Sequence, residues 1–135
     1  MSDWNSTIIE EFRANEGRVG GRFEGEDILL LHHTGARSGI ERVNPLVYVP
    51  DGDHMIIVAS AAGAPKNPDW FYNLRAHPHT TVEVGTATVT VDTTEVTDEE
   101  YPELWKRVTT ALPRFAEYQQ NTTRRIPMMI LQPTQ

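Results

Sequence analysis

The chain has 135 residues with a formal net charge of −7, and it contains no cysteine. This length suits one compact domain with a single core and is too short for two. The lack of cysteine excludes disulfides, thiolate chemistry and cysteine-bound structural zinc, and the negative charge disfavours nucleic-acid partners, which require a basic face. An anionic ligand must therefore be held by a local cluster of cations.

Residues 1–26 are expected to form an N-terminal helix and a mobile loop, and residues 27–135 to form the main domain. Ile8, Ile9 and Phe12 fall on one face of a helix between residues 5 and 16, and the loop GRVGGRFEGED mixes four glycines with charges. The N-terminus is acidic where a signal peptide is basic, and no stretch has membrane-spanning length. We therefore expect a cytoplasmic protein.

A meander of three antiparallel strands is predicted for residues 27–34, 42–50 and 54–60. The first, DILLLHHT, is apolar on both faces at its start, which is typical of a barrel strand covered by a helix. The second alternates between two faces, and Pro45 within it indicates a bulge or a sheet edge. The turns GARSG and DGD connect the three strands.

The stretch GAPKNPDWFYNL, residues 63–74, predicts a helix with Asn67 as its N-cap and Pro68 at the first helical position. Trp70, Phe71 and Leu74 share one face of this helix and are expected to be buried. The free N–H groups at the helix start, beside a lysine, suit an anion or a planar polar ring.

A second hairpin, a helical region and a closing strand complete the chain. The hairpin covers residues 80–96 around Gly85, and Ala87, Val89 and Val91 are expected to face inward. Thr97 and Glu100 have the spacing of a capping box before a helix, and IPMMILQP at 126–133 supplies a sixth strand. The elements together predict a mainly β (α+β) fold, a six-stranded antiparallel barrel with flanking helices.

No sequence motif indicates a metal or a nucleotide. His32 and His33 are adjacent and point to opposite faces of a strand, and the other histidines lack metal-ligand spacing. Esterase, nucleotidase and Rossmann dehydrogenase functions lack their glycine and serine signatures. We expect no metal site.

Polar residues are instead distributed over segments that the meander brings to one end of the barrel. Arg37, Arg42 and Lys66 could form a positive rim for a phosphate or carboxylate, with Trp70 as an aromatic wall. The alternative is that they are three solvated surface cations.

The segments LLLHHTGARSG, RVNPLVYV, IVASAAGAPKNPDWFYNLRAHP and YQQNTTRRIPMMILQP resemble the deazaflavin-dependent nitroreductases, also described as coenzyme F-420-dependent quinone reductases. The resemblance covers residues 28–133. It implies a split β-barrel, with the deazaflavin in a groove and its lactyl-phosphate and glutamate tail held by the basic turn and strand. It also implies hydride transfer from the reduced cofactor to a quinone-like or other activated acceptor.

The resemblance assigns the cofactor contacts to three stretches, together with Lys66. These are Arg37, Ser38, Arg42, Val43, Asn44, Pro45 and Leu46; Val58, Ala59, Ser60 and Ala61; and Asp69, Trp70, Phe71, Tyr72 and Asn73.

The substrate pocket is expected at Leu112, Phe115 and Tyr118, and the catalytic side chains are expected to be Ser60 and Tyr118. Nitroreductases of the family carry tyrosines at this three-residue spacing, whereas only Tyr118 keeps a hydroxyl here. This difference disfavours bulky nitroaromatics and favours a flat, hydrophobic quinone.

Two alternatives stay open from the sequence. An FMN-binding split-barrel oxidoreductase would share the architecture, and a non-catalytic carrier would bind a deazaflavin or hydrophobic ligand without turnover. The N-terminal helix, with Trp4, Ile8, Ile9 and Phe12, could pack on the barrel, fold over the pocket or touch a membrane surface at the inner face of the cell membrane. The oligomeric state is not predicted.

Overall fold

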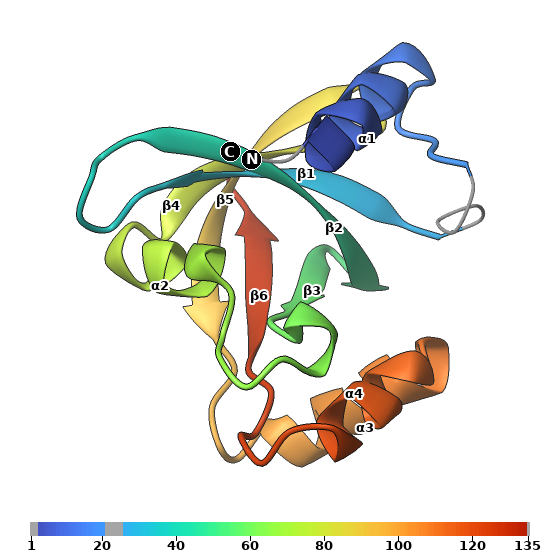
Figure 1. Cartoon of the computed structure of the whole chain (residues 1–135), viewed down its shortest axis with the longest axis vertical. Coiled ribbons are helices and arrows are strands. Elements are labelled where there is room, and N and C mark those ends of the chain that lie inside the picture. Colours follow the sequence, from blue (N-terminus) through green and yellow to red (C-terminus); the bar gives the residue numbers. More distant parts are fainter. Residues whose placement is uncertain (1–2, 21–25, 135) are drawn as a thin grey trace.

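The computed structural model describes residues 3–20 and 26–134, and only the backbone of residues 3–5 and 62. In chain order its elements are α1 (Asp3–Ala14), β1 (Ile28–Thr34), β2 (Glu41–Asp51), β3 (His54–Val58), the 3-10 turn η2 (Ala61–Gly63), α2 (Asp69–Ala76), β4 (His79–Val84), β5 (Ala87–Glu95), α3 (Tyr101–Ala111), α4 (Arg114–Gln120) and β6 (Met128–Pro133). The strands close into an antiparallel barrel in the order β1-β2-β3-β6-β5-β4 (Figure 1). The predicted fold class is confirmed.

The barrel interior is filled by alternate side chains of the strands, because neighbours along a strand point to opposite faces. Leu29 and Leu31 of β1 point inward and are fully buried. Trp70, Phe71 and Leu74 of α2 join the same cluster, as the sequence predicted. Helix α2 therefore covers one end of the barrel, and its apolar face is part of the core.

Two further apolar clusters cover the outside of the barrel, beneath the helices α1, α3 and α4 that Figure 1 labels. Ile8 and Phe12 of α1 pack on the outward-facing Ile28 and Leu30 of β1. Helices α3 and α4 lie together beyond one end of β6 and pack on the outer face of β3 and β6 around Val108. Helix α1 thus packs on the barrel, which was one of the three placements considered for it from the sequence. The side chain of Trp4 is not among the side chains that the structure describes.

The edge predicted at Pro45 is present. Residues 41–47 of β2 pair only with β1, and pairing with β3 begins at Tyr48, so Pro45 needs no N–H on its open side. The reciprocal hydrogen bonds of the predicted capping box form, because Thr97 and Glu100 each donate a backbone N–H to the other side chain. They close the turn just before α3, whose N-cap is Glu100 and not Thr97 as predicted.

Two local predictions are wrong. Helix α2 is preceded by Pro68 and not capped by Asn67, whose side chain is instead engaged by Arg124 and Tyr72. Ala87 is exposed because it begins its strand beyond the part of the barrel that α2 and the core fill, whereas Val89 and Val91 face the core as expected.

Among the described residues, none of the helices combines the length and hydropathy that crossing a membrane requires.

Candidate functional site: a basic hollow beside α2

A hollow of about 1070 Å³ lies between α1, the turn after β1, the start of β2, and α2. We call it the basic hollow. Nine of the predicted cofactor-binding residues line it: Arg37, Ser38, Arg42, Val43, Asn44, Asp69, Trp70, Tyr72 and Asn73. Ser6 and Ile9 of α1, His33, Gly35, Ala36 and Pro68 complete the lining.

Arg37 and Arg42, which line this hollow, have no acidic partner among the described residues. Within residues 3–20 and 26–134, Arg37 and Arg42 form no ion pair, whereas five other arginines are paired with carboxylates: Arg13, Arg75, Arg107, Arg114 and Arg125. Unpaired guanidinium groups are ready to bind phosphate or carboxylate through two parallel hydrogen bonds.

The turn that carries Arg37 is held by its own hydrogen bonds. The N–H of Gly35 donates to the carbonyl of Ile40 at 2.9 Å, and the N–H of Gly39 donates to the carbonyl of Gly35 at 3.0 Å. The hydroxyl of Ser38 accepts from the N–H of Ile40 at 3.2 Å. Gly39 has φ +71, a conformation that favours glycine. The turn therefore presents its basic side chain from a closed backbone loop.

A buried polar network joins this turn to α2 and β2. The Ala36 N–H donates to Oδ1 of Asn73 at 2.9 Å, and Nδ2 of Asn73 lies 3.0 Å from Nδ1 of His33. The other ring nitrogen of His33 lies 2.6 Å from Oδ1 of Asn44. His33 is 2% exposed, and its burial lowers the pKa of the imidazole, which favours the neutral ring.

A second network begins at Arg124 in the C-terminal segment and reaches the hollow at Tyr72. The guanidinium of Arg124 donates to the carbonyls of Ala59, Ser60 and Ala64 and to Oδ1 of Asn67. Nδ2 of Asn67 in turn donates to the hydroxyl of Tyr72 at 3.1 Å. Burial lowers the pKa of Arg124, and no carboxylate pairs with it in the described part of the chain. This one side chain therefore binds four oxygen atoms of the segment that connects β3 to α2.

Trp70 separates the basic hollow from the core, since it lines the former and is only 5% exposed. The remaining predicted cofactor contacts do not line the hollow. Pro45 and Leu46 continue along β2, with Leu46 packed on the barrel interior, and Val58, Ala59 and Phe71 belong to apolar clusters. Lys66 is exposed on the loop before α2.

The segment that carries Ser60 lies next to α4. Ser60 is buried and Ala61 is exposed with φ +46, a strained conformation for a residue with a side chain. A Cβ at Gly63 would lie 2.9 Å from the carbonyl oxygen of Tyr118, so η2 and α4 touch through backbone atoms. This contact brings the two predicted catalytic residues, Ser60 and Tyr118, onto neighbouring elements.

The predicted substrate-pocket residues do not share one described hollow. Phe115 is buried and meets Tyr118 edge to face at 5.6 Å. Leu112 instead lines a small cavity of about 190 Å³ with Glu26, Tyr48 and Pro50.

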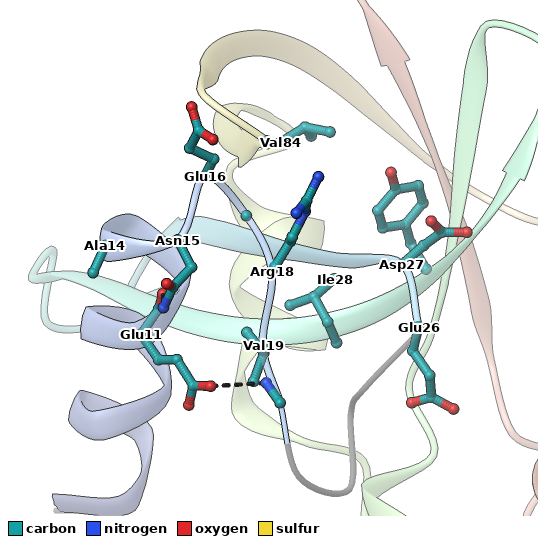
Figure 2. A pocket seen from close by; sticks show the side chains of 14 residues that line it. Glu11, Ala14, Asn15, Glu16, Arg18, Val19, Glu26, Asp27, Ile28 and Val84 are labelled. Atoms are coloured by element: carbon teal, nitrogen blue, oxygen red, sulfur yellow. Dashed lines mark hydrogen bonds between the residues drawn. The ribbon is translucent and has the colours of Figure 1, made fainter.

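A second large hollow, of about 870 Å³, lies at the loop after α1 (Figure 2). We call it the acidic hollow, because its described lining residues include four carboxylates, those of Glu11, Glu16, Glu26 and Asp27, and one cation, Arg18. Figure 2 shows the Glu11 carboxylate accepting from a backbone N–H, that of Gly20, at 2.8 Å. Its charge opposes the binding of an anion.

His33 and Arg124 are the residues that the sequence did not reveal. The sequence did contain a signal for His33, because it lies two positions after Leu31 and four after Leu29 and so points to the same, inward face of β1. A polar side chain at such a core position needs a hydrogen-bond partner. The sequence contained no such signal for Arg124, since the residues that it contacts are about 60 positions away in the chain.

The closed six-stranded barrel with a basic hollow at one end has the architecture of a split-barrel oxidoreductase that holds a flat cofactor with an anionic tail. Residues 4–133 match the model of the family described as F420H(2)-dependent quinone reductase. The chain belongs to this family.

Relatives and solved structures agree with this assignment. A Mycobacterium tuberculosis F420H(2)-dependent quinone reductase is 39% identical over 124 residues, which cover 89% of this chain and 83% of the relative. A solved F420-H2-dependent reductase superposes with a TM-score of 0.71 at 37% identity, covering 78% of this chain and 94% of that structure. A further solved structure, described only as a domain-swapped dimer, has a TM-score of 0.73 at 35% identity, and the match covers 96% of this chain and 98% of that one.

Proposed function

We propose that this protein transfers a hydride from reduced coenzyme F-420 to a quinone-like acceptor, and that the basic hollow binds the phosphate and carboxylate groups of the cofactor tail. The observation that supports this most is that Arg37 and Arg42, which form no ion pair with any described carboxylate, lie on the wall of a hollow of about 1070 Å³. When bound, the reduced deazaflavin supplies a hydride from one ring carbon and needs neither a metal nor a protein thiol.

The donor set fits such a tail. A phosphate or carboxylate offers only acceptors, and Arg37, Arg42 and the Ser38 hydroxyl offer donors close to a structured turn. Asp69 is the one carboxylate among the described lining residues. Trp70 gives the hollow a flat apolar wall toward the core.

We place the ring-binding part of the site at the end of β3, where Ser60 and Ala61 lead into η2, which contacts α4. Ser60 would hydrogen-bond the ring or the acceptor, and Lys66 would add a cation at the rim. Val58, Ala59, Pro45 and Leu46 would support this groove from below. The chain's contribution is to hold the acceptor close to the reacting carbon and to exclude water.

The acceptor is proposed to approach from the side of α4, along Tyr118, with Leu112 and Phe115 as apolar surroundings. Phe115 and Tyr118 pack on each other beside η2, so the hydroxyl of Tyr118 is the one polar group of this predicted set. A quinone needs mostly apolar contacts of this kind, whereas a bulky nitroaromatic would lack the polar contacts that further tyrosines provide.

Titration of the purified protein with coenzyme F-420 and with FMN, followed by ligand fluorescence, tests the cofactor assignment. We expect saturable quenching of F-420 and none of FMN; the opposite result would favour an FMN-binding oxidoreductase.

Turnover of menadione with reduced F-420 then distinguishes an enzyme from a carrier. Ser60→Ala is expected to lower the hydride-transfer rate more than the cofactor affinity. Equal rates in the two proteins would remove Ser60 from the mechanism.

A further inference from the structure

Two hydrogen-bond chains that end at the basic hollow begin at groups that can only donate. A backbone N–H and a guanidinium have no acceptor atom, so an amide that meets either one must turn its oxygen toward it. The direction of every later hydrogen bond in the chain then follows.

The first chain begins at the N–H of Ala36. It donates to Oδ1 of Asn73, so the NH2 group of Asn73 must face His33 and donate to Nδ1 at 3.0 Å. Nδ1 of His33 is therefore an acceptor and carries no hydrogen.

The hydrogen of the neutral His33 ring must then lie on Nε2. It donates to Oδ1 of Asn44 at 2.6 Å, so the NH2 group of Asn44 is turned away from His33. Asn44 lines the basic hollow, and in the described part of the chain its NH2 group has no partner. The first chain thus leaves an N–H donor at the wall of the hollow.

The second chain begins at Arg124. Its guanidinium donates to Oδ1 of Asn67 at 2.7 Å, which turns the NH2 group of Asn67 toward Tyr72. The phenol oxygen accepts this hydrogen bond at 3.1 Å, so the O–H of Tyr72 remains available to donate. Tyr72 lines the hollow and is 46% exposed.

We propose that His33 and Arg124 are positioning residues, which act through these two chains to fix Asn44 and Tyr72 as hydrogen-bond donors toward the basic hollow. The hollow then selects a ligand whose groups only accept, namely the phosphate and carboxylates of the cofactor tail. This inference rests on the proposed function, because it adds the residues that set the polarity of the same site.

Asn67→Asp tests the second chain, because it keeps the shape of the side chain and replaces the NH2 donor by an oxygen. One carboxylate oxygen still accepts from Arg124, while the other accepts from Tyr72 and draws its O–H away from the hollow. The readout is the dissociation constant of oxidised F-420 and of 8-hydroxy-5-deazariboflavin, which has the same ring but no phosphate or carboxylate. We expect about tenfold weaker F-420 binding and less than a twofold change for the tail-less compound.

Two controls exclude a loss of folding and a direct effect of the new charge as causes of weaker binding by Asn67→Asp. The new carboxylate pairs with Arg124, so the melting temperature of Asn67→Asp is expected to equal or exceed that of the wild type. In a Tyr72→Phe background, Asn67→Asp is expected to change F-420 affinity no further, since its effect acts through the hydroxyl. A tenfold loss in both backgrounds, or an equal loss for both ligands, would overturn the second chain.

The first chain is read directly from the imidazole of His33. Nitrogen-15 NMR of the ring at pH 7 is expected to show a protonated Nε2 and an unprotonated Nδ1, and the opposite tautomer would overturn the inference. Asn44→Ala is expected to weaken F-420 several-fold and to leave the tail-less compound unchanged; equal binding of F-420 would overturn the role of Asn44.

Arg37→Gln with Arg42→Gln separates this inference from the proposed function. If that double variant loses F-420 affinity while the Asn67 and Asn44 variants do not, the hollow binds the tail but the two chains do not set its polarity. If the double variant binds F-420 as the wild type does, the proposed function itself fails.

Discussion

The acidic and basic hollows are similar in volume, about 870 and 1070 Å³, and both border α1, yet their charges are opposite. Among the described lining residues, the acidic hollow has four carboxylates and one cation, Arg18, whereas the basic hollow has two arginines, Arg37 and Arg42, and one carboxylate, Asp69. The unpaired charges, and not the volume, distinguish the hollow that suits an anionic cofactor.

Charge reversal at the basic hollow is expected to have the largest effect. Arg37→Glu with Arg42→Glu should weaken F-420 binding by about 100-fold, because two charge-assisted contacts are lost and two repulsions are added. The matched change in the acidic hollow, Arg18→Glu, should alter affinity less than twofold. Fluorescence titration at one ionic strength measures both, and similar losses in the two proteins would erase the distinction between the hollows.

Gly17→Ala is expected to damage the acidic hollow alone. Gly17 has φ +92, and a Cβ there would lie 2.6 Å from Cα of Gly85, so we expect about 2 kcal/mol of destabilisation. Gly52 is the matched control, because it has φ +63 with open space around it, and Gly52→Ala should cost about 1 kcal/mol. Denaturant unfolding measures both. Cofactor affinity of folded Gly17→Ala should equal that of the wild type, and a tenfold loss would link the two hollows.

Ionic strength provides a milder test of the same comparison. Arg37 and Arg42 are exposed, so added salt should screen their attraction for the tail, and F-420 affinity should fall roughly tenfold between low and high salt. The affinity of 8-hydroxy-5-deazariboflavin should be almost constant over the same range. An equal salt dependence for both compounds would assign the effect to something other than the tail.

The smallest expected effect is the pH dependence that His33 adds to stability. Its pKa is lowered from 6.5 by burial, so the unfolded chain binds a proton that the folded protein resists. The free energy of unfolding should therefore fall as pH is lowered from 6.5 toward the depressed folded value, and His33→Gln should reduce this slope. Glu83, whose pKa is lowered from 4.5 by its hydrogen bond with Arg13, changes the free energy of unfolding only in more acidic solution, outside the pH range used for this test. Unfolding curves between pH 5 and 7 check this, and an identical slope in both proteins would contradict it.

The sequence predicted the barrel because its signals are local. Alternation along β2, the proline at an unpaired edge and the capping box at α3 each depend on a few neighbouring residues. The cap of α2 was missed for the opposite reason. Asn67 has the local preference of an N-cap, but contacts with Arg124 and Tyr72 from other parts of the structure engage its side chain.

The candidate site was predictable in part. The turn with Arg37 and the strand with Arg42 converge with Trp70 because the meander and α2 share one end of the barrel. Ser60 does not line that hollow, and the carbonyl of Ser60 is held by Arg124, a long-range contact that no spacing in the sequence indicates. The polarity of the site likewise depends on His33, whose two partners, Asn44 and Asn73, come from β2 and α2.

A titration of nitrogen-15-labelled protein with oxidised F-420, followed amide by amide, compares the two hollows in one experiment. The account predicts that the amide signals of Ala36, Arg37, Ser38, Asn44 and Tyr72 shift, while those of Gly17, Arg18 and Gly20 stay in place. Shifts confined to residues 17–20 and Gly85, with the basic hollow unchanged, would contradict it.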